Sequence, residues 1–383
     1  MSSATERLRI LVVTRSYPAP GDLYQYPFVH RRVLAYQNAG HAVAVFRAKD
    51  QAEPSEHQFE GVTCTTGGAD ALASFAGEWC PNVIAVHGLS EAQWPAVSVL
   101  AGRYPICAWL HGSEIPDFAR HKAMWDLAGE ERTRALQAIE QRCEFWRGLL
   151  DRPPSRFRLV SVSEASVAMF RRDLGDALPP LAVIPNPIDS DLFRYEPKAA
   201  SQRFRVLMIR PFDSHGYGND LAVRAILELA RRNGFEQLRF TIVGDGLLFD
   251  RTLAPLRDLA NVSVERGFVP QARIAELHRN HGIFLVPTRL DTQGVSRDEA
   301  MSSGLVPATN AIPAVSEYVD GNCAVLAPPE DTDALADGIW QLVQEPERFS
   351  AMSAAAAARV RRQSGTAVTI PRELALLQET ASG

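Results

Sequence analysis

The stretch PTRLDTQGVSRDEAMSSGLVP, residues 287–307, brings together residue types that could bind a phosphorylated ligand. Gly294 ends a short loop and precedes a segment with the composition of a helix. The N–H groups and the dipole at a helix start favour an anion such as a diphosphate, and glycine allows close approach. Asp291 stands before the helix start and Glu299 stands on the helix, where it could accept hydrogen bonds from paired hydroxyls such as a ribose. This pattern suits a nucleotide sugar.

The same residues also fit a purely structural interpretation. In it, Asp291 caps the helix and Glu299 is a buried, hydrogen-bonded acid. The segment alone does not decide between the two interpretations.

Short apolar runs alternate with helical patterns along the chain. These elements must position Asp291 and Glu299. The runs that resemble strands are residues 9–18 (a strand ending in a turn), 41–48, 83–88, 106–112, 158–163, 204–211, 238–246, 262–269, 282–289, 305–310 and 324–329. Helical spacing appears between them, for example in residues 28–40 and 219–234. Strands rich in Val and Ile that alternate with helices indicate parallel sheets covered on both faces. We therefore predict an α/β chain with two doubly wound, Rossmann-like sheets.

The length of 383 residues favours two domains, because one core rarely serves so long a chain. Residues 183–202 are rich in Pro, Asp and Ser, as in a linker. We expect an N-terminal domain over 1–190, a C-terminal domain over 191–360, and a helical segment over 361–383 that returns toward the N-terminal domain. Two such domains facing each other would form a central cleft lined by the C-terminal strand ends, where such sheets bind ligands.

Composition excludes several classes of protein. A net charge of -5 argues against a nucleic-acid partner, which would require a basic face. The chain has no apolar run long enough to span a membrane and no apolar signal region at its start. The five cysteines are scattered, which suits a reducing cytoplasm and offers no zinc site: Cys64, Cys80, Cys107, Cys143 and Cys323.

The ordered set of motifs resembles the retaining glycosyltransferases of family 4, which have the GT-B fold. Asp291 and Glu299, followed by AMSSG, resemble the E-x7-E signature of that family. Further matching segments are Tyr17-Pro18, AGHAVAVF (39–46), WLHGSE (109–114), LVSVSEAS (159–166), VIPNPIDSDLF (183–193), MIRPF (208–212), TIVGDG (241–246) and residues 265–289. The resemblance extends from Arg9 to about Val360.

The resemblance implies catalytic roles for three residues. Arg210 would pair with the diphosphate and stabilise the leaving group, as the planar guanidinium suits. Asp291 would contact hydroxyls of the transferred sugar, and His111 would reach that sugar from the N-terminal domain.

The resemblance also implies a set of donor-binding residues. Glu299 would bind the ribose, and the N–H groups of Gln293, Gly294 and Val295 would meet sugar and phosphate. Gly244 and Gly246 would let the chain turn at the nucleotide, while Phe268, between Gly267 and Val269, would place backbone groups at the base edge.

Three departures from the family pattern matter. Asp291 replaces the usual glutamate and is one methylene shorter. The expected lysine after Arg210 is missing, and Tyr217 aligns best with its position. The diphosphate charge would then rest on Arg210 and the helix start, with Arg289, Arg297 and Arg31 as further candidates. Gly21 is a weak substitute for the Gly-Gly pair of the entry loop.

We therefore expect a metal-independent, retaining glycosyltransferase without a cofactor. The donor would be a nucleotide-diphosphate sugar, UDP before GDP, and the acceptor a glycan, lipid-linked or other glycoconjugate of bacterial polysaccharide synthesis. No D-x-D motif lies in the donor half, and the pair His278 and His281 has the spacing of ordinary surface residues. The amphipathic segment 130–158 mixes acids with arginines, which favours a packed, solvated helix over peripheral contact with the inner membrane surface. A nucleotide-sugar 2-epimerase and an inert nucleotide-sugar-binding protein are the alternatives.

Overall fold

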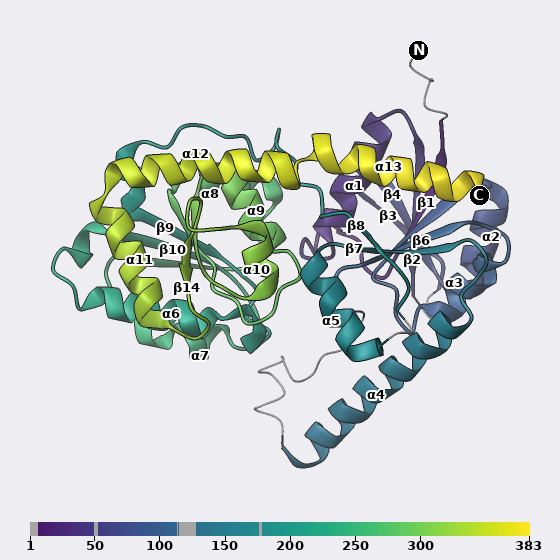
Figure 1. The fold of residues 1–383 in the computed structure, drawn as a ribbon, viewed down its shortest axis with the longest axis horizontal. Helices are drawn as coiled ribbons and strands as arrows, with labels where there is room; N and C mark the ends of the chain where they lie inside the picture. Colours follow the sequence, from purple (N-terminus) through teal and green to yellow (C-terminus); the bar gives the residue numbers. More distant parts are fainter. Residues whose placement is uncertain (1–6, 50–52, 113, 115–127, 176–177) are drawn as a thin grey trace. The chain divides into compact units, whose positions relative to one another are not determined.

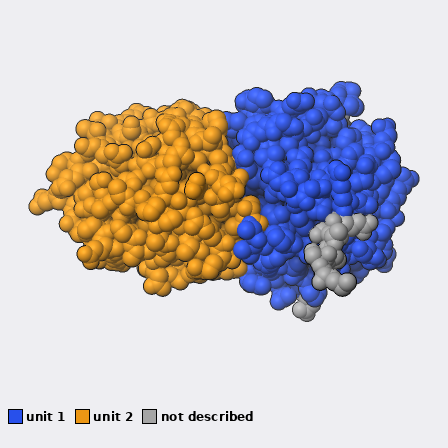
Figure 2. All heavy atoms as spheres, turned by 90° about the horizontal axis from the view of Figure 1, so that it is seen from above, with its two compact units in different colours: residues 1–117, 134–187, 367–383 blue, residues 118–133, 188–366 orange. Residues whose placement is uncertain are grey.

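The computed structural model describes residues 7–49, 53–112, 114, 128–175 and 178–383. The chain divides into two compact units, coloured separately in Figure 2. Unit 1 comprises residues 1–117, 134–187 and 367–383, and unit 2 comprises residues 118–133 and 188–366. The expected domain boundary at residue 190 lies close to this division.

Unit 1 contains an eight-stranded sheet in the order β3-β4-β2-β1-β5-β6-β7-β8. Its strands are β1 (Arg9–Thr14), β2 (Ala42–Ala48), β3 (Ser55–Phe59), β4 (Val62–Gly67), β5 (Val83–His87), β6 (Ile106–Leu110), β7 (Phe157–Ser161) and β8 (Ala182–Val183). All neighbouring strands pair in parallel except β3 and β4, which form an antiparallel hairpin. The central strands β5 and β6 are buried at every position, as expected for a sheet covered on both faces.

The helices that lie wholly or mostly in unit 1 are α1 (Pro27–Asn38), α2 (Ala69–Trp79), α3 (Trp94–Ala101), α4 (Gly129–Asp151), α5 (Glu164–Leu174) and α13 (Thr366–Ser382) (Figure 1). One face of the sheet packs against α1 and α13 through a shared apolar cluster that includes Val33, Trp109 and Leu377. Helix α1 begins with Pro27 and is followed by Gly40 at φ 91°, the stop that the sequence predicts. Helix α13 therefore brings the end of the chain against strands from its beginning.

Unit 2 contains a six-stranded sheet in the order β11-β10-β9-β12-β13-β14, and its five strand pairs are parallel. Its strands are β9 (Arg205–Ile209), β10 (Arg239–Gly244), β11 (Val262–Arg266), β12 (Ile283–Leu285), β13 (Val306–Asn310) and β14 (Val325–Ala327). The predicted doubly wound α/β architecture is thereby confirmed for both halves of the chain.

The helices of unit 2 form a layer on each face of its sheet (Figure 1). They are α6 (Asn219–Ala230), α7 (Phe249–Leu253), α8 (Gln271–Asn280), α9 (Val295–Ser302), α10 (Pro313–Tyr318), α11 (Thr332–Gln344) and α12 (Pro346–Gln363). Helices α6, α7 and α11 share one apolar core with the sheet, whereas α8 and α9 pack on the opposite face. This second layer places the helix after Gly294 directly over the sheet.

The sequence analysis missed the hairpin β3–β4 and the two-residue strand β8. Strand β3, SEHQF, is polar and largely exposed at the edge of its sheet, so it lacks the apolar run of a central strand. Its connection is a two-residue turn in which Glu60 and Gly61 both have positive φ. A glycine-containing two-residue turn between alternating segments is a hairpin signal that could have revealed it.

Candidate functional site

The topological switch point of unit 2 lies at β9. This strand lies between β10 and β12. The strands that follow in the sequence are added first on one side of β9 (β10, β11) and then on its other side (β12, β13, β14). Doubly wound sheets bind ligands at such a point, beyond the carboxyl ends of the strands. Arg210 directly follows β9, and the loop from Val286 to Gly294 directly follows β12. The fold therefore places Arg210 and the predicted anion loop at one edge of one sheet.

Arg210 is a buried guanidinium whose hydrogen-bond partners are neutral. Its side chain Nη2 donates to the carbonyl oxygens of Tyr217 (3.1 Å) and Pro287 (3.4 Å), and the residue is 6% exposed. Its Cζ lies 5.1 Å from the centre of the Tyr217 ring. Within the described ranges, Nε has no hydrogen-bond partner and the guanidinium has no carboxylate partner. A buried cation in this state is a candidate for binding an anion.

Arg289 clamps the loop that carries Tyr217. Its guanidinium donates to both oxygens of Asp220 (2.6 and 2.9 Å) and to Glu330 (2.8 Å). The carbonyl of Gly216 also accepts from the backbone N–H of Arg289 (2.9 Å) and from Thr288 Oγ1 (3.2 Å). Arg289, which the sequence analysis considered as a second diphosphate cation, is therefore already paired with two carboxylates.

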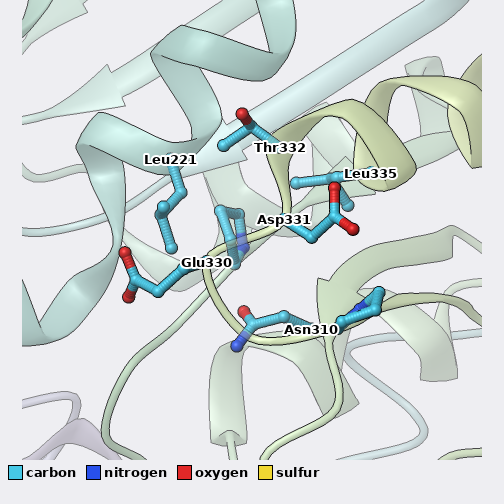
Figure 3. Close-up of a pocket in the computed structure, with 8 residues that line it drawn as sticks. Leu221, Asn310, Glu330, Asp331, Thr332 and Leu335 are labelled. Carbon is cyan, nitrogen blue, oxygen red and sulfur yellow. The ribbon is translucent and has the colours of Figure 1, made fainter.

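The clamp borders a small hollow on unit 2. Figure 3 shows Leu221, Asn310, Glu330, Asp331, Thr332 and Leu335 around it, and Pro287 and Pro328 complete the lining. Asn310 accepts from the backbone N–H of Thr288 (2.7 Å) and donates to the carbonyl of the same residue. The loop after β12 is thus held from both sides.

Helix α9 begins directly after its N-cap residue Gly294, as predicted, but the charges beneath it are already paired. Gly294 has φ 95°, and a Cβ at this position would lie 2.9 Å from Arg297 Nη1. Arg297 donates to Asp298 (2.7 Å), which in turn accepts from Gln293 Nε2 (3.1 Å). All three side chains are at most 2% exposed. Arg297 is therefore a buried structural partner of Asp298 and is not an accessible diphosphate cation.

The two signature acids are half-buried, and each has a protein partner. Asp291 Oδ1 accepts from the backbone N–H groups of Thr292 (2.8 Å) and Gln293 (3.2 Å). Glu299 Oε1 accepts from Gln271 Nε2 at 3.3 Å. Asp291 thus closes its own turn, as the structural interpretation expects. The same bond occupies the Gln293 N–H, leaving Gly294 and Val295 as the candidate donors, since the first N–H groups of a helix have no intrahelical acceptor.

Close backbone contacts explain why the VGDG segment has glycine at positions 244 and 246. A Cβ on Gly244 would lie 2.0 Å from the carbonyl oxygen of Arg210, and one on Gly246 would lie 2.5 Å from the carbonyl carbon of Phe212. Gly246 also has φ 142°. Because they have no Cβ, these glycines let the end of β10 lie close to the backbone of Arg210 and Phe212. Beyond them, Phe268 is 38% exposed, and Leu247, which the sequence analysis did not single out, is 92% exposed.

In unit 1, His111 follows β6 and pairs with a second histidine. Its Nε2 lies 3.0 Å from Nδ1 of His87, and the two rings stack with centres 5.3 Å apart. Burial lowers the pKa of the His111 imidazole well below its usual value, and the charges of Arg32 and Arg15 act in the same direction. His87 is fully buried, so it contacts His111 and Trp109 and offers no surface to a ligand. Gly21 lies in an exposed turn closed by backbone bonds between Ala19 and Asp22.

The remaining candidates have ordinary structural partners. His278, expected on the surface, is buried and lies 3.2 Å from Ser303 Oγ, while the buried His281 lies 2.7 Å from the carbonyl of Leu277. No cluster of three metal-ligating side chains occurs in the part of the chain that the structure describes. Over the same residues, no helix has the length and apolar character needed to cross a membrane.

Comparison with known proteins relates this chain to a described family and to solved folds. Residues 203–345, within unit 2, match the family model described as glycosyl transferases group 1. An MMP alpha-(1->4)-mannosyltransferase of Mycolicibacterium hassiacum is 25% identical over 193 residues, which is 50% of this chain and 46% of that protein. The alignment thus spans about half the length of that relative.

Solved structures resemble almost the whole chain. Sucrose-phosphate synthase of Thermosynechococcus elongatus has a TM-score of 0.76 at 14% identity, covering 98% of this chain and 100% of that one. HepE of Anabaena, solved with UDP-glucose, has a TM-score of 0.70 at 17% identity with the same coverage. Both likenesses concern the fold, which is GT-B. The family match in unit 2 and these structures together support a glycosyltransferase with the GT-B fold.

Proposed function

We propose that this protein is a retaining glycosyltransferase that transfers a sugar from a UDP-sugar to a hydroxyl of a glycan, lipid-linked or other glycoconjugate acceptor. The match of residues 203–345 to glycosyl transferases group 1 supports the reaction class. The UDP-glucose complex of HepE and the mannosyltransferase relative support a nucleotide-sugar donor. The scattered cysteines suit a reaction in a reducing cytoplasm, and the acceptor proposed here belongs to bacterial polysaccharide synthesis.

Arg210 is the observation that carries the proposal. A permanently charged side chain at the switch point is buried against carbonyl oxygens, and its Nε has no partner in the described structure. Burying such a charge is costly unless a counter-ion completes the site. A diphosphate at the start of α9 would complete it, because the helix N–H groups and Arg210 lie at the same edge of the sheet.

The proposed chemistry uses charge stabilisation and positioning. As the bond from the anomeric carbon to the diphosphate breaks, negative charge grows on the leaving oxygens, and Arg210 with the α9 N–H groups would stabilise it. Glu299 would accept hydrogen bonds from the ribose, and Asp291 from hydroxyls of the sugar. In a single displacement, retention requires the acceptor hydroxyl to attack on the face from which the diphosphate departs, and its proton would pass to an oxygen of the leaving diphosphate.

A calorimetric titration tests the donor site. Wild-type protein is titrated with UDP, GDP, CDP and ADP, with and without magnesium, alongside Glu299→Ala. We expect metal-independent binding of UDP that Glu299→Ala weakens at least tenfold. Unchanged affinity in Glu299→Ala would remove that residue from the ribose role, and binding of none of the four would support an inert protein.

A turnover assay tests the leaving-group role of Arg210. Arg210→Ala should lower kcat at least a hundredfold, equivalent to about 3 kcal/mol of lost stabilisation. Arg231→Ala is the matched control, because Arg231, the exposed residue that follows α6, pairs only with Glu228 of that helix within the described structure. A near-normal rate for Arg210→Ala would refute the assignment. Conversion of the donor without any acceptor would instead support the epimerase.

A further inference from the structure

The residue before Gly294 is fixed by three hydrogen bonds within unit 2. The carbonyl oxygen of Gln293 accepts from Arg297 Nη2, and the N–H of Gln293 donates to Asp291 Oδ1 (3.2 Å). The Gln293 side chain donates from Nε2 to Asp298 Oδ2 (3.1 Å). Gln293 is only 1% exposed. These contacts therefore fix the peptide bond that joins Gln293 to Gly294.

The direction of the Gly294 N–H follows from the position of Arg297. The described chain has no cis peptide bond, so the carbonyl of Gln293 and the N–H of Gly294 point in opposite directions within one plane. The carbonyl points to the buried guanidinium of Arg297, and the N–H therefore points away from it. Among the residues that the structure describes, none accepts a hydrogen bond from this N–H, although Gly294 is buried. A buried N–H in this state indicates that an acceptor is still to be supplied.

The guanidinium of Arg297 is itself oriented by Asp298. Its Nε and Nη2 both donate to Asp298 Oδ1 (3.0 and 2.7 Å), and the ring centre of Tyr318 lies 5.6 Å from Cζ. Nη1 has no hydrogen-bond partner in the described part of the chain. It lies on the side of Gly294, where a Cβ would be 2.9 Å away. The positive end of the buried ion pair is thus next to the backbone of Gly294.

This arrangement also strengthens the Gly294 N–H as a donor. A charged donor on a peptide carbonyl polarises the peptide, and successive hydrogen bonds strengthen one another. The guanidinium and the dipole of α9 both favour negative charge at the start of the helix. A buried ion pair is by itself weak evidence for stabilisation, because apolar residues of similar volume often serve as well. Its place beneath an N–H without an acceptor gives the pair another role.

We propose that Arg297 and Asp298 are positioning residues that aim the Gly294 N–H at a phosphate group of the nucleotide-sugar donor without touching that donor. The identity of the ligand rests on the proposed function. Arg297 holds the carbonyl side of the peptide bond, and Asp298 holds both Arg297 and the side chain of Gln293. The N–H side of the same peptide bond is left for a phosphate oxygen.

This single peptide bond can be observed by NMR, because the order Gln-Gly occurs once in the sequence, at 293–294. Protein labelled with ¹³C-carbonyl glutamine and ¹⁵N-glycine gives one correlation, between the Gln293 carbonyl carbon and the Gly294 N–H. On addition of UDP we expect the Gly294 proton to move downfield, as for an N–H that donates to an anion. UDP binding that leaves this signal in place would overturn the proposal.

The variant Arg297→Met with Asp298→Asn removes the ion pair, leaves no unpaired buried charge and keeps an amide oxygen for the Gln293 side chain. Without ligand, the Gln293 carbonyl carbon should move upfield, because its charged donor is lost. UDP affinity, measured by calorimetry, should fall about tenfold, as for the loss of one well-placed hydrogen bond. Arg232→Met with Asp337→Asn is the matched control, since it makes the same change in an ion pair of unit 2 whose side chains are 26% and 60% exposed. The control should keep both wild-type values.

The outcomes separate this role from the proposed function. If the wild type binds no UDP, the proposed function fails and this role fails with it. If the wild type binds UDP and the two double variants bind it equally well, only the role of the buried pair is refuted. Should Arg297→Met with Asp298→Asn fail to fold, Arg297→Met with Asp298→Leu replaces it with the same expected results, since an apolar pair is often tolerated at such a place.

Discussion

Asp291 shows how one side chain can satisfy a structural and a functional interpretation together. Its Oδ1 accepts two backbone N–H groups, which is the hydrogen bonding of a turn-closing residue. That role needs an acceptor oxygen but no charge. The role toward sugar hydroxyls uses the carboxylate, since charged acceptors form the stronger hydrogen bonds.

Asp291→Asn separates the two roles, because the amide keeps an oxygen for the turn and removes the charge. We expect the melting temperature to change by less than about 2 °C and kcat to fall at least tenfold. Asp291→Ala is the comparison variant and should lower both, since it also abolishes the turn bonds. If Asp291→Asn keeps full activity, the residue is a cap and its assignment to the sugar is wrong.

At the scale of elements, the loops after β9 and β12 are held together by shared hydrogen bonds and ion pairs. The Gly216 carbonyl joins them through the backbone, and Arg289 joins them through Asp220. Arg289 is nearly buried, with a side chain that is 6% exposed, whereas its carboxylate partners are 30% and 47% exposed. Since Arg210 donates to Tyr217 and Pro287, one residue from each loop, the clamp also fixes the predicted diphosphate cation.

Arg289→Leu should therefore weaken both stability and nucleotide binding. We expect a loss of about 2 kcal/mol in the free energy of unfolding, as for other broken buried polar networks. UDP affinity should fall about tenfold, because the loops no longer hold Arg210 in place. Arg224→Leu is the control: Arg224 reaches the same Asp220 at 3.2 Å but is 48% exposed, so its loss should change stability by less than about 1 kcal/mol. Unfolding in urea and calorimetry measure both effects, and equal results for the two variants would refute the clamp.

A feature could be predicted from the sequence when neighbouring residues determine it, and could not be predicted when contacts between distant segments determine it. Central strands such as β5 and β6 are recognisable because burial on both faces demands a continuous apolar run. The start of α9 is recognisable because Gly294 adopts a backbone conformation that few other residues tolerate. The hydrogen-bond partners of the arginines could not be predicted in this way. Arg289 pairs with Asp220 and Glu330, whereas Arg210 donates to carbonyl oxygens. These contacts join distant segments, so the residues next to each arginine in the sequence do not indicate them. The sequence therefore identified the loops after β9 and β12, whose role as the donor site stays a prediction, but it did not show that Arg289 and Arg297 are already paired with carboxylates.

At the scale of the whole molecule, both units bury histidines, and this makes stability depend on pH. In unit 1 burial lowers the pKa of His30, His41, His87 and His111, and in unit 2 that of His281. Burial, with smaller contributions from Lys198 and His281, lowers the pKa of His278 to about 3. Between this value and the usual 6.5, the unfolded chain binds protons that the folded chain does not.

The sign of the effect follows from that difference in bound protons. Because the unfolded state binds more protons below pH 6.5, acid favours unfolding, and the stability present above pH 6.5 is lost as the pH falls. Each histidine that stays neutral in the folded state contributes a slope of at most about 1.4 kcal/mol per pH unit. The buried carboxyl groups of Glu114, Asp298 and Glu373 have pKa values raised by burial and act in the opposite direction, since they retain protons in the folded state at pH values where the unfolded chain has lost them.

His278→Asn isolates one histidine from this sum. Asparagine can keep a polar contact with Ser303, which lies 3.2 Å from His278 Nδ1, but it does not titrate. We expect the free energy of unfolding of the wild type to fall as the pH is lowered from 7 to 5, and the variant to lose less over the same interval, whatever its stability at pH 7. Urea unfolding at half-unit pH steps measures both curves, and comparison of slopes removes any constant cost of the substitution. Parallel curves would mean that His278 takes up its proton equally well in the folded state, contrary to its burial beside Lys198.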